Sequence, residues 1–373
     1  MTDPTTARTW LDAERATLIS TCAYTAAHGW PGHTTRLAAT LFRYLDAGGH
    51  YPDTLVIDTH ARHAARHAGD PGAEACALTQ LGIIYWEQNH YGHAADHLAH
   101  AFAICREIGD RSGEARALTH LGIVYWQQGH YQQAADHLEQ ALTLTREISD
   151  PDGEALALTC LGLVYWRQGH YQQATDHLEQ ALTLTREIGH RDGEASALTI
   201  LGVVYWKTAH YQQAAQQLQQ ALTLSPIGGN PLGEARALEG LGLVYPGQGH
   251  YQQATKHHQQ ALTLFRELGD RSGEARALNG LGETLHATGQ LHEARNQHTT
   301  ALTLATQIGD RYEQARAHNG IAHTYNATGK AAQQARHHWH QALAIYTKLS
   351  VPEAEDVHAH LATLDQAADD DGH

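Results

Sequence analysis

A unit of 40 residues recurs seven times in this chain, and this repeat restricts the possible folds more than any other feature of the sequence. Residues 113–152 and 153–192 differ at 8 of their 40 positions. A fixed period of this length is typical of a solenoid, in which each unit buries its apolar face against the next. Because solenoids expose long concave surfaces, the repeat favours binding of another molecule over catalysis. The pattern L-G-x-x-Y marks the units at Leu81, Leu121, Leu161, Leu201 and Leu241, with weaker versions at Leu281 and Ile321.

Each unit is predicted to form two antiparallel helices. In the unit 110–149, apolar residues recur with a helical period from Ala117 to Tyr125 and again from Ala134 to Leu144. Gly122 lies on the inner face of the first helix, where the lack of a side chain lets the second helix approach closely. The position before each first helix is predicted to be an N-cap, and it holds Asp70, Asp110, Asp150, Asn230, Asp270 and Asp310.

The repeat divides the chain into three parts. Seven units are predicted to cover residues 71–350, and residues 1–70 are interpreted as a capping helix followed by a degenerate unit. Residues 351–373 are interpreted as a polar capping helix at 353–366 and a disordered acidic tail, ADDDGH. In the fourth unit, two prolines and two glycines between Ser225 and Pro231 predict that the second helix stops early, with a break in the array near 225–231.

The repeat itself resembles a known family. Its pattern, L-G-x-x-Y followed by A-x-x-x-L-x-x-A, resembles the tetratricopeptide repeat over about three quarters of the chain and is carried here by Leu121, Gly122, Tyr125, Ala134, Leu138 and Ala141. The units have 40 residues rather than about 34, so they are similar to the kinesin-light-chain-like type. The resemblance implies an all-α fold, a right-handed superhelix of antiparallel helix pairs (an α-solenoid), whose concave groove binds a protein or peptide.

A second resemblance concerns the N-terminal segment. Residues 10–29, WLDAERATLISTCAYTAAHG, resemble the segment that precedes the helical sensor arm of bacterial signal-transduction ATPase regulators. The phosphate-binding motif G-x-x-x-x-G-K-[ST] does not occur, because Gly329-Lys330 lacks both the preceding glycine and the following Ser or Thr. The resemblance therefore implies the sensor arm of such a regulator without the ATPase.

Charge and composition exclude several function classes. The net charge of −15 argues against nucleic acid and anionic membrane surfaces as partners, because both are gripped by Lys and Arg. No stretch is long and apolar enough for a membrane span, and the polar N-terminus MTDPTTARTW lacks the apolar run of a signal peptide. The four cysteines show no paired spacing, which predicts a reduced protein in the cytoplasm. No cofactor motif is present, and the near-identical repeats favour self-association as a further expectation.

The first helices of the units are predicted to line the concave groove. In the first half of the array, four tryptophans and four threonines fall on one helix face by their i, i+3 and i+4 spacing. Exposed aromatic side chains in a concavity are typical of a binding surface, whereas the alternative is that each Trp packs between neighbouring first helices. These candidate binding residues are Thr79, Trp86, Thr119, Trp126, Thr159, Trp166, Thr199 and Trp206.

From the fifth unit onward the same positions become polar. Asn offers a donor and an acceptor for an extended peptide backbone, and Arg can bind a carboxylate, so a polar half of a peptide groove is predicted. The alternative for any single residue is a solvated helix face, and the coordinated change over three units favours binding. The candidate residues of this half are Arg236, Glu239, Arg276, Asn279, Glu283, His286, Arg316, Asn319, His323 and Asn326.

The sequence therefore predicts a non-catalytic, regulatory protein- or peptide-binding scaffold. One alternative is a signal-sensing arm that acts in trans on a transcription regulator or ATPase. A second alternative is a metal-binding or enzymatic repeat protein, suggested by the histidine rows and by Glu283, His286 and His323. This alternative is weaker, because no acidic or Cys ligand completes a metal site and no nucleophile accompanies the three groove residues.

The unusual segment between the fourth and fifth units generates a first testable prediction. Because proline and glycine weaken a helix, amides near Ser225–Pro231 should exchange faster than their counterparts in the other units, and proteases should cut there first. Hydrogen exchange with mass spectrometry measures this. Uniform protection across residues 215–235 would contradict the prediction.

Overall fold

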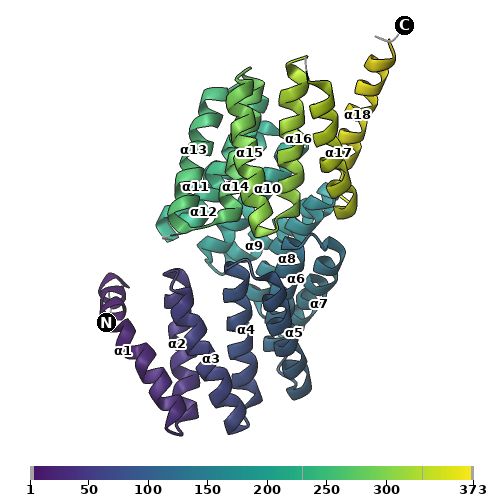
Figure 1. The fold of residues 1–373 in the computed structure, drawn as a ribbon. Helices are drawn as coiled ribbons and strands as arrows, with labels where there is room; N and C mark the ends of the chain where they lie inside the picture. The colour runs from purple at the N-terminus through teal and green to yellow at the C-terminus, as the bar shows by residue number, and fades with distance from the viewer. Residues whose placement is uncertain (1–3, 229, 330, 371–373) are drawn as a thin grey trace. The chain divides into compact units, whose positions relative to one another are not determined.

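The computed structural model describes residues 4–228, 230–329 and 331–370, and over these residues it contains helices and no strand, which confirms the all-α prediction (Figure 1). The N-terminal helices are α1 (Pro4–Ala27), α2 (Pro31–Ala47) and α3 (Tyr51–Ala68). The first helices of the repeats are α4 (Pro71–Glu87), α6 (Arg111–Gln127), α8 (Pro151–Arg167), α10 (Arg191–Lys207), α12 (Pro231–Val244), α14 (Arg271–Ala287) and α16 (Arg311–Ala327). The second helices are α5 (Tyr91–Ile108), α7 (Tyr131–Glu147), α9 (Tyr171–Glu187), α11 (Tyr211–Gly228), α13 (Tyr251–Leu268), α15 (Leu291–Ile308) and α17 (Ala332–Leu349). A short 3-10 turn, η1 (Tyr245–Gln248), follows α12, and α18 (Glu353–Asp370) is the C-terminal helix.

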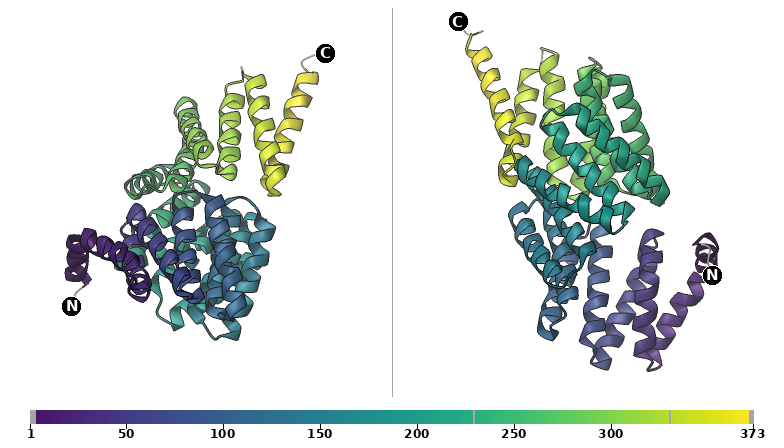
Figure 2. Two further views of the ribbon diagram at one scale, coloured as in Figure 1. Left: turned by 60° about the horizontal axis from the view of Figure 1, so that its bottom comes forward. Right: turned by 180° about the vertical axis from the view of Figure 1, so that it is seen from behind.

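The chain forms two compact units, each made of several 40-residue repeats. The first compact unit has residues 1–125 and 136–153, and the second has residues 126–135 and 154–373. Below, the first unit and the second unit of the structure mean these two. In the first unit, α1 packs on α2 and α3, and the helices from α2 to α5 follow one another as antiparallel neighbours (Figures 1 and 2). In the second unit, the helices from α9 to α18 are neighbours in the same sequential order. The predicted boundaries at residues 70 and 350 fall in turns between helices, and the functional division of the chain remains a prediction.

The predicted N-caps are confirmed at all six positions. Each side-chain oxygen accepts a hydrogen bond from the main-chain N–H three residues later, as from Gly113 to Asp110 at 3.0 Å. This bond satisfies one of the main-chain donors left free at a helix start. The other five caps are Asp70, Asp150, Asn230, Asp270 and Asp310.

The turn between the fourth and fifth units differs from the prediction. Helix α11 continues past Ser225 and ends at Gly228, while Gly229 lies outside the described residues. The Asn230 N–H donates to the Ser225 carbonyl at 3.0 Å, the same bond that Asp270 makes with Phe265 in the next unit. The buried Ser225 hydroxyl donates to the Ala221 carbonyl at 3.0 Å, which adds a bond to the last turns of α11. Proline in this last turn removes one main-chain donor without ending the helix, and the predicted local weakness remains open to the exchange measurement.

One row of histidines packs on the tyrosines of the L-G-x-x-Y pattern. His97 on α5 stacks on Tyr85 of α4, with ring centroids 5.2 Å apart and an angle of 8° between the rings. Burial, together with the nearby Arg62 and His93, lowers the pKa of His97 and so favours its neutral form. The histidines of this row therefore have a packing role within their repeats. The same stack recurs between Tyr125 and His137, Tyr165 and His177, and Tyr245 and His257.

One buried position on each second helix, and its equivalent on α3, is here called the core slot. In α11, α13 and α15 its side chain lies between consecutive first helices. In the second helices α5, α7, α9 and α11 it holds a leucine that is fully buried. A Cβ added to Gly162 would lie 2.5 Å from Leu178, so the predicted close approach at the glycine is confirmed. At both ends of the array the core slot becomes polar or aromatic while remaining buried. Its occupants in chain order are Asp58, Leu98, Leu138, Leu178, Leu218, His258, His298 and Trp339.

The polar core slots generate a prediction about stability and pH. Burial lowers the pKa of His258 to about 3, whereas an unfolded histidine titrates near pH 6.5. The unfolded chain therefore takes up a proton below about pH 6.5 that the folded protein does not, and stability falls as the pH decreases from there toward 3. His258→Leu should remove about 2 kcal/mol of the loss in unfolding free energy between pH 7 and pH 5, measured by urea denaturation. Replacing the exposed His250 by Ala is the control and should leave that loss unchanged.

Asp58 should show the opposite sign. Burial raises the pKa of Asp58 well above its ordinary value, so its contribution to stability is present at acidic pH and is lost as the pH rises through the folded pKa. Asp58→Asn removes the charge that would have to be buried, and the variant should gain stability over the parent as the pH increases. A gain that is confined to acidic pH would contradict this assignment.

Candidate functional site

The four threonines of the predicted groove are buried. Thr79 is 3% exposed, and its hydroxyl donates to the Ala75 carbonyl of its own helix at 2.9 Å. Thr119, Thr159 and Thr199 make the equivalent bond with the residue four positions earlier. The hydroxyls are therefore engaged within their own helices, and we leave these threonines out of the surface proposed below.

The four tryptophans are half-buried. Trp86 packs against a core cluster formed by residues of its own repeat and the following one, and Trp206 packs against the equivalent cluster. The first cluster includes Leu98, Leu121 and Val124, and the second includes Leu218, Leu241 and Val244. Packing between neighbouring repeats, the alternative considered from the sequence, thus accounts for part of each of these two side chains. Trp126 and Trp166 differ, because their buried indole N–H groups find no acceptor among the described residues.

In the polar half, two predicted arginines bind carboxylates that belong to the chain itself. Arg276 lies 3.1 Å from both carboxylate oxygens of Glu239, and this pair is largely buried. Arg316 donates twice to Glu283, at 2.7 and 2.8 Å. Burial alone would raise the pKa of Glu283, but the ion pair with Arg316 outweighs it and lowers this pKa. These contacts join consecutive first helices, so they hold the repeats together.

Two of the three predicted asparagines, Asn279 and Asn319, serve the core slots. Asn279 is fully buried; its Oδ1 accepts a hydrogen bond from His298 Nδ1 at 3.0 Å, and its Nδ2 donates to Glu313 at 2.9 Å. The indole N–H of Trp339 donates to Asn319 at 3.0 Å. Each asparagine thus provides an acceptor for the ring nitrogen that enters the core of the same repeat, and Asn279 also uses its amide nitrogen within the chain.

Two of the remaining predicted residues, His286 and His323, belong to a group of rings that reaches the C-terminal helix α18. The ring centroid of His323 lies 5.4 Å from that of Trp339 on α17 and 4.7 Å from that of His360 on α18. The ring centroid of His286 lies 5.9 Å from that of His323. Burial, together with His360 and His286, lowers the pKa of His323 to about 4, so the ring is neutral near pH 7. The side chains of Asn326 and Arg236 are exposed on α16 and α12.

The second compact unit contains a cluster that joins the predicted Trp126 and Trp166 to Arg167 and Tyr312, two residues that the sequence analysis missed. Arg167, at the end of α8, is 8% exposed, and its guanidinium carbon lies 3.6 Å from the ring centroid of Tyr312 and 4.2 Å from that of Trp166. Trp126 approaches the same guanidinium from 5.9 Å. Beside this cluster, Tyr312 donates to Glu353 at 2.8 Å, and Lys207 binds the same carboxylate at 2.7 Å. The available signal was the comparison of the near-identical units, in which Arg167 replaces Gln127.

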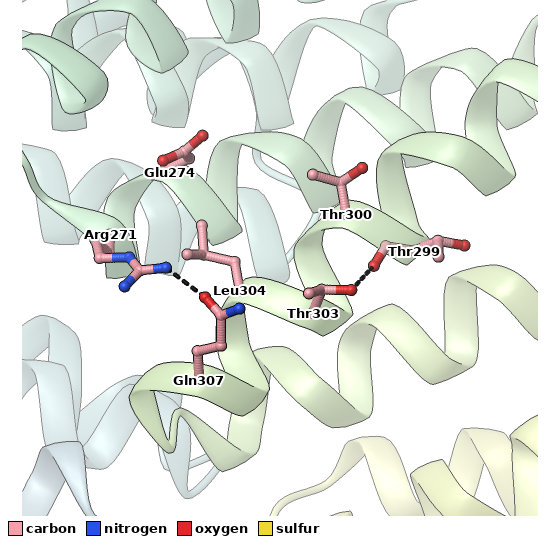
Figure 3. Close-up of a pocket in the computed structure, with 7 residues that line it drawn as sticks. All are labelled: Arg271, Glu274, Thr299, Thr300, Thr303, Leu304 and Gln307. Atoms are coloured by element: carbon pink, nitrogen blue, oxygen red, sulfur yellow. Dashed lines mark hydrogen bonds between the residues drawn. The ribbon is translucent and has the colours of Figure 1, made fainter.

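Two hollows lie in the second unit. One, of about 450 Å³, is lined by residues of α14 and α15, including Arg271, Thr299 and Gln307, and Arg271 donates to Gln307 there (Figure 3). None of the predicted groove residues lines it. The other has a volume of about 20 Å³ and is lined by Trp126, Arg167 and Tyr312 among others. The smaller hollow therefore adjoins the aromatic and cationic side chains, and we take it as the candidate site.

The chemistry of other reactive groups is limited in the described part of the chain. No group of three His, Cys, Asp or Glu residues there is placed to hold a metal ion. All four cysteines are free thiols. Burial raises the pKa of Cys22 and Cys105 to about 11 and that of Cys160 to about 12, so these thiols are protonated and poor nucleophiles.

Comparison with known proteins adds family and fold. The family model described as tetratricopeptide repeat matches residues 73–147, 153–226 and 233–307, more than half of the chain. No curated protein matches the sequence.

Several solved structures share the fold. A Rap protein complexed with competence and sporulation factor has a TM-score of 0.63 and 13% identity, over 90% of this chain and 98% of that one. A Rap conjugation gene regulator of the plasmid pLS20, in complex with the Phr* peptide, has a TM-score of 0.66 and 12% identity, over 89% of this chain and 95% of that one. A signal transduction ATPase from Pyrococcus horikoshii with a tetratricopeptide repeat sensor has a TM-score of 0.52 and 15% identity, over 90% of this chain and 50% of that one.

The internal ion pair gives a prediction that separates structural from binding roles. Arg276→Met should destabilise the protein by about 3 kcal/mol, because it leaves the carboxylate of Glu239 buried without its partner. Adding Glu239→Thr, which restores the residue that Thr199 provides in the preceding repeat, should recover most of this loss. Thermal and urea unfolding of both variants measure the difference. Equal stability of Arg276→Met and the parent would show that the pair contributes nothing.

Proposed function

Because the chain belongs to the tetratricopeptide repeat family, we propose that it is a non-catalytic regulatory scaffold that binds a peptide on the first-helix side of its second unit. The observation that carries this proposal is the cluster of Trp126, Trp166, Arg167 and Tyr312. It combines aromatic area with a buried cation and two indole donors that are unused within the described residues. Aromatic and Arg side chains of this kind dominate the energy of most binding surfaces.

Two of the structural neighbours support this proposal, because they bind a factor or a peptide with a similar fold. One is a Rap protein complexed with competence and sporulation factor, and another is a Rap conjugation gene regulator in complex with a peptide. At 12–13% identity this likeness supports the fold, so the peptide itself is argued from the residues of the cluster. An acidic chain of net charge −15 also suits a peptide better than a nucleic acid as its partner. Among the described residues, no helix has both the length and the apolar character that crossing a membrane requires.

A second candidate function is a sensor arm that acts in trans on a separate regulator or ATPase. It is favoured by the fold shared with the Pyrococcus horikoshii protein, of which this chain covers half. The two functions are compatible, since a peptide bound to the scaffold could be the signal that such an arm detects. A complex formed between the full chain and a purified ATPase regulator only in the presence of peptide would support both.

The proposal predicts that a peptide selected by the full chain will depend on the tryptophans of the second unit. Peptides enriched from a random synthetic library would be resynthesised and titrated by calorimetry against the parent and Trp166→Ala. We expect at least about tenfold weaker binding by the variant, since aromatic anchors contribute more than about 1.4 kcal/mol each.

A matched control separates binding from folding. Trp86 occupies the equivalent repeat position in the first unit and is not part of the proposed cluster. Trp86→Ala should lower the melting temperature by a similar amount, because both side chains are half-buried and pack between helices. It should leave peptide affinity unchanged. Selection of no peptide, or equal loss of affinity in both variants, would reject the proposed site.

A further inference from the structure

We propose that the turn between α17 and α18 is a strap that closes the candidate peptide site and must detach before a peptide reaches it. The strap consists of residues 349–353, which are the end of α17, the turn itself and the start of α18. It lies at the end of the seventh repeat, yet it contacts the second, third and fourth repeats. The inference concerns access to the site, and it therefore rests on the proposed function.

The turn glycines of the repeats show where the strap lies. A Cβ added to Gly129, in the turn after α6, would overlap Leu349, and one added to Gly169, in the turn after α8, would lie 3.2 Å from Pro352. Gly249 occupies the equivalent turn of the fifth repeat, with a φ of 78° against 79° at Gly129. Among the described residues, nothing beyond its chain neighbours lies within 4 Å of a Cβ added there. The strap therefore covers two turns, whereas an equivalent one is open.

An ion pair fastens the start of α18. The Lys207 ammonium group, at the end of α10, lies 2.7 Å from the Glu353 carboxylate, and the two side chains are 25% and 16% exposed. The same carboxylate accepts a hydrogen bond from the Tyr312 hydroxyl at 2.8 Å. Burial alone would raise the pKa of Glu353, but Lys207 outweighs it and lowers this pKa, which favours the charged form. One carboxylate thus joins α18 to α10 and α16.

In this closed form the candidate site is too small for a peptide side chain. Tyr131 lines the hollow beside Arg167 and is 5% exposed, whereas its equivalents Tyr171 and Tyr211 are half-buried. Burial raises the pKa of Tyr131 to about 12, and the nearby charge of Glu353 adds to this rise. The hollow of about 20 Å³ has room for one water-sized group. A larger group can enter only after the strap has moved.

The strap can detach without unfolding the repeats. Three of its side chains, Leu349, Pro352 and Glu353, make the long-range contacts. Helix α18 itself packs on α17, and its residues Val357 and Leu361 are buried. An opening that breaks few contacts requires less free energy than global unfolding. A peptide that binds only the open form shifts this equilibrium, and its apparent affinity is reduced by the fraction of molecules that are open.

A disulfide can trap the closed form without any peptide. A Cβ at Gly169 would lie 3.6 Å from the Cβ of Pro352, within the range of about 3.5–4.5 Å that a disulfide requires. In the full chain carrying Gly169→Cys and Pro352→Cys, oxidised glutathione should therefore link the two positions, as peptide mapping by mass spectrometry measures. Each single variant controls for the native thiols and for the strain of a side chain at a φ of 79°. No bond between the two positions would overturn the proposal.

Peptide affinity then tests whether the strap has to open. A peptide selected by the parent should bind the reduced double-cysteine variant and lose at least about tenfold in affinity when the disulfide forms, with recovery on reduction. Glu353→Lys brings two cations together, so it should favour the open form and tighten binding about tenfold. Adding Lys207→Glu restores an opposite-charge pair and should return the affinity to that of the parent.

These measurements separate the strap from the proposed function. Equal affinity of the oxidised and reduced forms, for a peptide that depends on Trp166, would overturn the strap and leave the peptide scaffold intact. Tighter binding by Glu353→Lys that persists in the charge-swapped variant would show that the ion pair does not hold the strap. A disulfide that forms in a chain that selects no peptide would reject the scaffold and, with it, the control of access by the strap.

Discussion

The contact between a second-helix side chain and a first-helix glycine sets the spacing on which the repeats depend. In α8 and α9 this is Gly162 against Leu178, and a single added carbon at the glycine would overlap the leucine. The same side chain fills the gap toward the next first helix, as Leu218 does at both Gly202 and Gly240. Because interiors are packed as densely as crystals, one position therefore fixes the distance within a repeat and the distance between repeats.

Changing the occupant of this position changes the chemistry around it. Where His298 and Trp339 replace leucine, a ring nitrogen enters the core and must find a partner. Asn279 and Asn319 supply it, and Asn279 in turn draws Glu313 into the network. The polar character of the later first helices thus follows from their own cores. The peptide surface proposed above lies instead around Arg167 and the rings of Trp166 and Tyr312.

The fold could be predicted because its determinants are local and repeated. Caps such as Asp110 and the glycine approach each depend on residues that lie within one unit of the sequence. The site could be predicted only in part, because the side chains that neutralise one another come from different units. The pairing of Glu239 with Arg276 spans 37 positions, and that of Lys207 with Glu353 spans 146. The periodic pattern placed these polar residues on one helix face, but it could not tell which carboxylate each arginine would meet.

The differences among the core-slot residues also help near-identical repeats to pair in the correct register during folding. Units 113–152 and 153–192 are similar enough that a slipped pairing of their helices would bury almost the same leucines. A slip that carried His298 one unit along would separate it from Asn279 and from the glycine at Gly320, leaving a buried ring nitrogen without a partner and a side chain without space. The atypical repeats at the two ends of the array thereby fix the register in which the repeats pair. They make one alignment of the repeats lower in free energy than its neighbours, which the interchangeable central units could not do alone.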